Sequence, residues 1–352
     1  MSINYATKYA DKVAERFHIK SVTDDDCGKG YSWLNPGSRT IKVTSVDTVP
    51  ETQYKRSGDN RYGETYDLGD TLQEMTCEQA PAFSFTIDAL DGSDQAIRKS
   101  AGRALRRQLD EVTIPGIDKH RIKRWALGAN IVMKKTAAPT KSTIAEMVMD
   151  AGVAMDNAGV PSEERTLYIG AAYYKLVKLC PEFLALKDLG QKAVGKGVVG
   201  ELDGMRVKKI PDTYMPDGIY FFIKAKGSTV DPVKLQQYDI LNKVKGYSGP
   251  VVQGVTYHDA FVLGAKGDGI AVVGSADAIL DAPVITVSAA HAASITAVSG
   301  VQFKYTVDGS NPRYSDTAQV YTAAVTLREG QVFKAVGTKD GCVGILDEKA
   351  YA

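Results

Sequence analysis

Histidine and cysteine, the side chains that most often act as bases, nucleophiles or metal ligands, are few and scattered in this sequence. They are His18, His120, His258, His291, Cys27, Cys77, Cys180 and Cys342. No set of them has the spacing of a zinc-binding motif, and there is no Cys-x-x-Cys pair. We therefore expect neither a metal site nor a disulfide framework, and we interpret the cysteines as reduced, structural thiols.

Two glycine-rich strings invite comparison with phosphate-binding loops. Gly195, Gly197 and Gly200 satisfy the fingerprint G-x-G-x-x-G, which also requires a helix that begins at the third glycine. The residues that follow, 201–204, read Glu-Leu-Asp-Gly and predict a turn into a strand instead. The string 264–267 lacks the terminal Lys-Ser/Thr of a phosphate loop, so we expect no nucleotide cofactor.

The acidic run Asp24, Asp25 and Asp26 could attract a hard cation. It lacks the alternating ligands and the central glycine of a calcium loop. We interpret it as a solvated turn.

The features of two hydrolase classes are missing as well. The sequence contains no Gly-x-Ser-x-Gly nucleophile elbow. A carbohydrate-active enzyme is expected to line its cleft with aromatic side chains and two opposed carboxylates, and Trp33 and Trp125 are the only tryptophans. We expect that the chain is not an enzyme and uses no cofactor.

One segment, 98–124, carries a strong local charge. Nine basic residues stand there against three acidic ones, which gives a net charge of +6. A basic helix face could contact DNA or the acidic surface of a partner, and the candidate residues for this contact are Arg98, Lys99, Arg103, Arg106 and Arg107. The alternative is a solvated helix face that neighbouring carboxylates neutralise.

The composition is that of a soluble, folded protein of two or three domains. The chain has 352 residues, of which 44% are hydrophobic and 24% are charged, and its formal charge is +1. A charge this small gives no global attraction to nucleic acid or to an anionic membrane. The N-terminus has no apolar core of the kind a secretory signal needs, and no window approaches the roughly 18 consecutive apolar residues of a membrane span.

The first third of the chain predicts an arm, a hairpin and a basic helix. Residues 1 to about 20 suit a helical arm, because Tyr5, Tyr9, Val13 and Phe17 recur once per turn. A strand over 39–46, a polar tip and a return over 65–77 make a long polar hairpin, which must lean on another surface to be stable. A strand follows over 82–88, and a helix runs from about 91 to 112, where Pro115 interrupts or restarts it.

The middle of the chain mixes helices and strands without regular alternation, which indicates an α+β fold. Helices are expected over 117–127, 142–157 and 171–179, and strands over 166–169, 219–224, 251–257, 260–263 and 270–273. From about 276 the pattern becomes purely β, with strands over 284–287, 301–306, 324–327 and 332–338. We expect a separate small all-β domain there, joined by a short linker near 274–277 and making few contacts with the body.

The order of arm, polar hairpin, AFSFTID strand and basic helix with ALRRQLDEVTIPGID resembles the major capsid proteins of tailed bacteriophages, the Hong Kong 97 type of fold. The phrases KGVVGELDGMRVKKIPD and VQGVTYHDAFVLGAKGDGIAVV look like the axial and peripheral strands of these proteins. The resemblance implies an N-terminal arm over 1–30, an extended loop over 31–80 and a peripheral domain with a spine helix over 81–140. An axial domain with returning peripheral strands would occupy 141–275, and an immunoglobulin-like β domain 276–352.

The C-terminal domain carries a second resemblance. The string YTVDGSNP at 305–312, followed by Tyr321 and FKAV at 333–336, is similar to small immunoglobulin-like domains of chitobiase-type hydrolases and phage surface proteins. In phage capsid proteins such domains project outward and touch cell-surface carbohydrate. The sequence shows no aromatic platform for sugar.

These resemblances imply a structural protein that self-assembles into hexamers and pentamers of an icosahedral shell around double-stranded DNA. It would be made in the bacterial cytoplasm, reside in the virion capsid, and have scaffolding and portal proteins as partners. The hairpin tip would contact a neighbouring subunit through Lys55, Arg56, Asp59, Arg61 and Glu64. A carbohydrate-active enzyme and a phage tail or adhesin protein, each with a C-terminal immunoglobulin-like module, are the alternatives.

Overall fold

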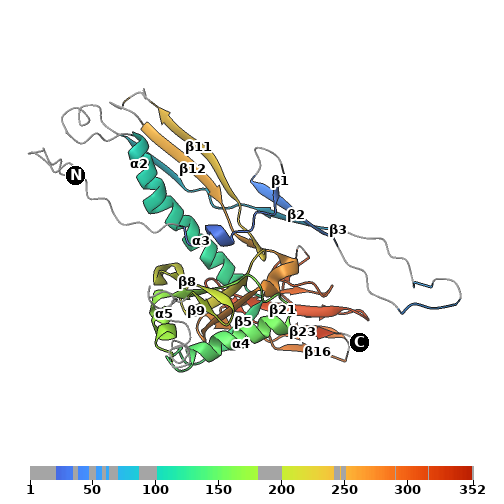
Figure 1. The fold of residues 1–352 in the computed structure, drawn as a ribbon. Helices are drawn as coiled ribbons and strands as arrows, with labels where there is room; N and C mark the ends of the chain where they lie inside the picture. The colour runs from blue at the N-terminus through green and yellow to red at the C-terminus, as the bar shows by residue number, and fades with distance from the viewer. Residues whose placement is uncertain are drawn as a thin grey trace, which may run out of the picture.

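The computed structural model describes residues 21–34, 39–46, 53–57, 61–62, 70–86, 101–180, 200–241, 246, 251–289, 291–315 and 317–350. The predicted arm over 1–20 and four candidate site residues, Asp59, Glu64, Arg98 and Lys99, lie outside the described residues. Figure 1 shows a mixed body from which a hairpin projects.

A six-stranded mixed sheet forms the centre of the body. Its strand order is β5 (Ile131–Lys135), β14 (Ile270–Ser275), β9 (Ile219–Ala225), β6 (Arg165–Gly170), β8 (Met205–Ile210) and β7 (Glu201–Leu202). Helices α4 (Ile144–Asn157) and α5 (Ala171–Lys178) pack on one face and α3 (Ile114–Leu127) on the other. Every residue of β6 and β9 is buried, as expected for strands covered on both faces.

The basic segment forms one long helical spine. It consists of α2 (Ala101–Gln108), the π-helical segment η2 (Leu109–Thr113) and α3. The sequence left two options for Pro115, that it interrupts the helix or that it restarts it. The helix is not interrupted: α-helical geometry restarts at Ile114, and Pro115 stands in the first turn of α3. Pro115 has no N–H, and its ring would clash with the carbonyl four residues earlier in an α-helix, so the wider π turn directly before it gives the ring room.

A three-stranded antiparallel sheet runs alongside the spine helix (Figure 1). Its order is β11 (Val233–Leu241), β12 (Val251–His258) and β4 (Ala82–Thr86), so the predicted AFSFTID strand pairs with a strand about 170 residues later. A short pair, β10 (Thr229–Val230) and β13 (Phe261–Val262), connects this sheet to the central one.

The projecting hairpin consists of β2 (Thr40–Val46) and β3 (Asp70–Thr76), with β1 (Ser32–Trp33) beside β2. Its base is buried: Ile41 and Met75 pack against Val230 of the body. Among the described residues, the hairpin packs on the body at its base, and β2 and β3 run outward from it (Figure 1).

The C-terminal region is a small β sandwich, as predicted. One sheet contains β16 (Ile285–Val287), β17 (Ala292–Ile295) and β20 (Val325–Thr326). The other contains β19 (Gln319–Val320), β18 (Gln302–Thr306), β21 (Val332–Thr338) and β23 (Leu346–Ala350). Its core includes Phe303, Leu327 and Phe333.

The expectation that this domain makes few contacts with the body is wrong. Strands β15 (Ile279–Leu280) and β22 (Val343–Gly344) pair in parallel, and Ile279 and Val343 belong to the same core as the central sheet and α3. At the C-terminal end of the spine helix, Arg313 donates a hydrogen bond to the carbonyl of Ala129 (2.6 Å), and the Tyr314 hydroxyl donates to that of Gly128. The domain therefore caps the spine helix, where carbonyl groups lack helical partners.

Candidate functional site

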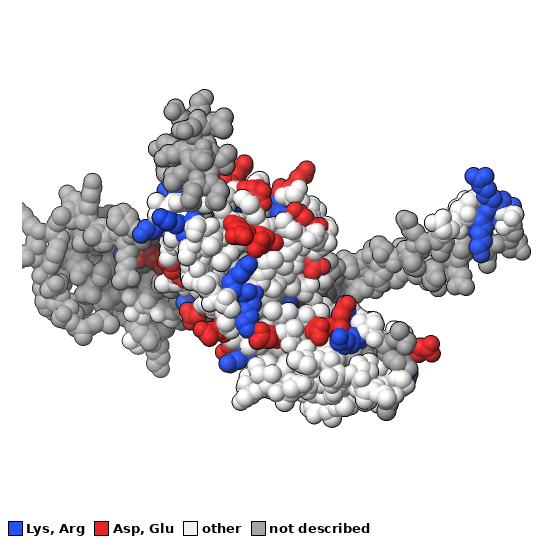
Figure 2. All heavy atoms as spheres, turned by 90° about the horizontal axis from the view of Figure 1, so that it is seen from below, with Lys and Arg blue, Asp and Glu red and all other residues white. Residues whose placement is uncertain are grey.

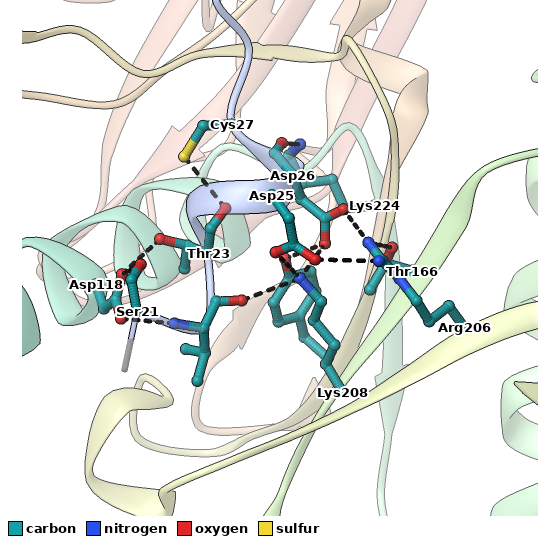
Figure 3. A network of polar contacts seen from close by, with 12 residues as sticks. Ser21, Thr23, Asp25, Asp26, Cys27, Asp118, Thr166, Arg206, Lys208 and Lys224 are labelled. Atoms are coloured by element: carbon teal, nitrogen blue, oxygen red, sulfur yellow. Dashed lines mark hydrogen bonds and ion pairs between the residues drawn. The ribbon is translucent and has the colours of Figure 1, made fainter. Parts of the chain in front are cut away.

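Among the described residues, a dense polar network is formed by residues 21–28, at the start of the first described range, which include the short 3-10 turn η1 (Asp24–Asp26). Figure 3 shows this segment between the spine helix and the central sheet. On the helix side, Asp118 accepts hydrogen bonds from Ser21 Oγ (2.8 Å), the Val22 N–H (2.9 Å) and Thr23 Oγ1 (2.6 Å). We call residues 21–28 the anchor segment.

The acidic run faces cations of the central sheet. Arg206 and Lys208 stand two residues apart on β8, so both side chains point to the same face and reach the run. Arg206 pairs with Asp25 (3.0 Å) and with Asp26, while Lys208 Nζ lies 2.8 Å from Asp26 Oδ2. The interpretation of this run as a solvated turn holds for Asp24 and Asp25, which are exposed. It is wrong for Asp26, which is 5% exposed and engaged in this network.

The charge states of this network follow from burial and pairing. Burial opposes ionisation of Asp26, but hydrogen bonds from Lys208 and from the Tyr168 hydroxyl (2.5 Å) outweigh it and lower the pKa of Asp26. Lys224 donates from Nζ to the Asp26 carbonyl (2.7 Å) and lies 4.6 Å from the centre of the Trp125 ring. Burial lowers the pKa of Lys224.

A second buried carboxylate, Asp231, closes the far end of the anchor segment. It accepts hydrogen bonds from Trp125 Nε1 (2.7 Å), Thr229 Oγ1 (2.8 Å) and the Gly28 N–H (3.1 Å), and burial raises the pKa of Asp231. A Cβ at Gly28 would lie 1.6 Å from the Thr229 carbonyl oxygen, so only glycine fits there. The anchor segment thus joins the spine helix, the central sheet and the β10–β11 connection, and its chemistry is structural.

Two histidines that are far apart in the sequence meet at a second junction. The rings of His120 on α3 and His258 at the end of β12 are 5.4 Å apart, and His120 Nε2 lies 2.8 Å from Asp259 Oδ1. Asp259 also accepts the Glu78 N–H (3.0 Å), which ties the chain after β3 to this point. Burial, and next the charge of His120, lower the pKa of His258 to about 4. Within the described ranges, no three His, Cys, Asp or Glu side chains are grouped to hold a metal ion.

At the hairpin tip, the described residues of the candidate inter-subunit set are Lys55, Arg56 and Arg61, and all three are exposed. The backbone turns there through a hydrogen bond from the Lys55 N–H to the Arg61 carbonyl (2.9 Å), and the Tyr54 and Tyr62 rings lie 5.2 Å apart. Figure 2 shows basic side chains gathered at the far end of the projection.

In the basic helix, the described side chains of the candidate set have carboxylate partners one turn away. Arg107 Nε lies 2.8 Å from Glu111 Oε1, and Arg106 Nε lies 3.6 Å from Asp110 Oδ2. Arg103 is in α2. This geometry favours the neutralised face over a surface free to bind DNA.

The glycine fingerprint leads into a strand, as predicted. Gly200 precedes β7, and the turn at Asp203 and Gly204, both with positive φ, pairs β7 with β8. No helix begins at the third glycine, so the positive end of a helix dipole is not presented to a phosphate there.

Solved structures that are similar to this chain include phage proteins. The solved structure "Mycobacterium phage Che8" matches with a TM-score of 0.62 and 15% identity over 77% of this chain and 97% of that chain. A chain from the capsid structure of the cyanophage P-SCSP1u gives a TM-score of 0.60 and 15% identity over 77% of this chain and 93% of that one. A chain from the asymmetric unit of the mature capsid of bacteriophage PhiM1 gives a TM-score of 0.55 and 12% identity over 78% of this chain and 93% of that one.

The body has the phage major capsid protein fold. Its long helix is the spine helix of that fold, and the resemblance found in the sequence is confirmed at the level of fold. The family model "Fn3 associated" matches residues 294–344, within the C-terminal β sandwich. No curated protein matches the chain by sequence.

Proposed function

We propose that this chain is a phage major capsid protein, the repeating subunit of an icosahedral shell of hexamers and pentamers that encloses double-stranded DNA. The observation that supports this most strongly is the match of the capsid fold over 77% of this chain and 97% of a phage protein. The residues give no reason to add a catalytic role. No described helix is long and apolar enough to cross a membrane.

The hairpin supports an assembly role on physical grounds. Among the described residues of the hairpin, those at the base pack on the body, while those at the tip are exposed, including Tyr62 at 84%. A two-stranded hairpin alone is marginally stable in water, so a neighbouring subunit would order it. Lys55, Arg56 and Arg61 would pair with carboxylates of that neighbour, together with Asp59 and Glu64 in the same contact.

The remaining roles extend this proposal. The C-terminal β sandwich would be displayed on the outer surface, because the interior must hold densely packed DNA. From there it would be the part that contacts cell-surface carbohydrate. Scaffolding and portal proteins would be the other partners. The basic helix would face either packaged DNA or, as its ion pairs favour, protein carboxylates.

Electron microscopy of the purified full-length protein tests this function. Shells or capsomers, with extra density on the outside for residues 276–352, are the expected result. Monomers that hydrolyse glycosides would replace the proposal with an enzyme, and tubes or fibres would replace it with a tail or adhesin protein.

A further inference from the structure

A groove opens beside the anchor segment, on the side of the spine helix. Its volume is about 460 Å³, and its walls include Cys27 and Tyr31 from the N-terminal side, Ile114 and Ile117 from α3, and Val233 from β11. Val233 is 39% exposed, which is unusual for a valine next to a core. The groove thus offers an apolar surface with room for one or two large side chains. Its lining also includes charged residues, namely Asp24, Lys29, Asp118, Arg121 and Asp231.

One buried cation in the groove lacks part of its hydrogen bonding. Arg121 lines the groove and is 5% exposed. Its Nη1 donates to Thr23 Oγ1 (3.1 Å), but its Nε has no partner among the residues that the structure describes. Because this Nε is itself covered, its missing hydrogen bond belongs to the interior beneath the groove and not to the groove surface.

The chain itself leads into this groove. Ser21 is on the groove wall, and its side chain is fixed to Asp118, one residue after Ile117 and one turn from Ile114 and Arg121. Twenty residues precede Ser21, and the last apolar member of their stripe, Phe17, is four residues away, at most about 14 Å along an extended chain. Two residues before Ile114 on the spine helix, Val112 is a further exposed apolar side chain, at 56%.

We propose that residues 1–20 of the same chain dock on this groove, with the Phe17 ring between Ile114, Ile117 and Val233. The anchor segment then has the role of delivering the arm to the spine helix. This contact lies within one subunit, so it does not depend on the proposed function.

Disulfide trapping tests this placement in free subunits and in any assembled particles. The variant Phe17→Cys/Ile114→Cys, in a Cys27→Ser/Cys342→Ser background, is oxidised mildly and examined on non-reducing gels and by peptide mass spectrometry. We expect a disulfide between the introduced thiols within one chain. The matched control is Phe17→Cys/Val153→Cys, because Val153 is 56% exposed on α4, on the opposite face of the central sheet.

Trapping no greater than in the control would overturn the proposal. Covalent dimers in place of the internal disulfide would also overturn it, because they would place a neighbour's arm in the groove. As a second measurement, hydrogen exchange of residues 1–20 should be slowed in the unmodified chain and should rise at least tenfold in Phe17→Ala. Equal exchange in the two proteins would count against docking.

Discussion

At the scale of single residues, the anchor segment shows how a run of carboxylates becomes part of a core. Three aspartates in sequence would repel one another in a turn, yet Asp26 is buried because Lys208, Arg206, Lys224 and Tyr168 converge on it from three strands of the central sheet. Such a network is satisfied only when every member is present, since each loss leaves a buried charge without a partner.

Replacing Asp26 with Asn should therefore destabilise the subunit by about 2–4 kcal/mol, because Lys208 would lose its buried carboxylate partner and keep only the exposed Asp25, and the Tyr168 hydroxyl would lose a charged acceptor. Denaturant unfolding of the free subunit measures this. Asp24→Asn is the matched control, since Asp24 is an exposed residue of the same turn, and its effect should stay within about 0.5 kcal/mol. Equal effects of the two variants would contradict the network.

The histidine junction predicts a pH dependence. The pKa of His258 is about 4 in the folded chain against an ordinary value of 6.5, so the unfolded chain binds more protons between these values. Stability should fall as the pH drops from about 6.5 to about 4, by up to about 3 kcal/mol. Unfolding curves across this range measure the slope, and His258→Gln should flatten it. An unchanged slope in the variant would assign the effect to other groups.

At the scale of elements, changes at the hairpin tip should affect assembly without affecting the folding of the subunit. Its tip makes its described contacts within the hairpin, so Arg56→Glu/Arg61→Glu should leave the circular dichroism of the subunit unchanged and reduce the yield of shells at least tenfold. Lys141→Glu/Arg328→Glu makes the same change in charge at two exposed positions on the body and the C-terminal sandwich and should assemble normally. If both double variants assembled equally well, the tip would have no role between subunits.

Local pattern predicted elements better than it predicted contacts between them. The alternation in AFSFTID and the β-rich pattern after 276 were sufficient for β4 and for the sandwich, because period and turn residues act locally. The partners of Asp26 lie about 180 residues away on β8, and those of His120 about 140 residues away, so no spacing could reveal either cluster. The sequence could not show that the helix continues past Pro115, because the π turn that accommodates this proline has no sequence period of its own.

At the scale of the whole molecule, the C-terminal sandwich is part of the body's core. If the sandwich were an independent domain, as expected from the sequence, a chain ending at Ser275 would still assemble. Such a chain would lose Ile279 and Val343, which cover the central sheet, and Arg313 and Tyr314, which cap the spine helix. We now expect the shortened chain to aggregate or to unfold at a lower temperature, as light scattering and thermal unfolding would show. If the shortened chain were as stable as the full one, the sandwich would be independent of the body after all.

The same cap can be tested without truncation. Arg313→Ala should destabilise the chain by about 2–4 kcal/mol, because the buried carbonyls of Ala129 and Gly344 would lose their donor. Lys304→Ala, an exposed position on β18, is the control and should change stability by less than about 0.5 kcal/mol. Chemical denaturation compares the two.

The way the sandwich is joined to the spine helix decides where a foreign peptide could be added to this protein. Replacing the sandwich would remove the cap from the spine helix. The turns of the sandwich that lie away from Arg313 and Tyr314 do not contribute to this cap. The turn from Arg328 to Gln331 closes through a backbone hydrogen bond of 3.1 Å, contains Gly330 at a positive φ, and is exposed through Gly330. An epitope inserted at this turn would leave Arg313, Tyr314 and the β15–β22 pair untouched. If the sandwich lies on the outside of a shell, as proposed, this turn is the place at which to insert a peptide for display.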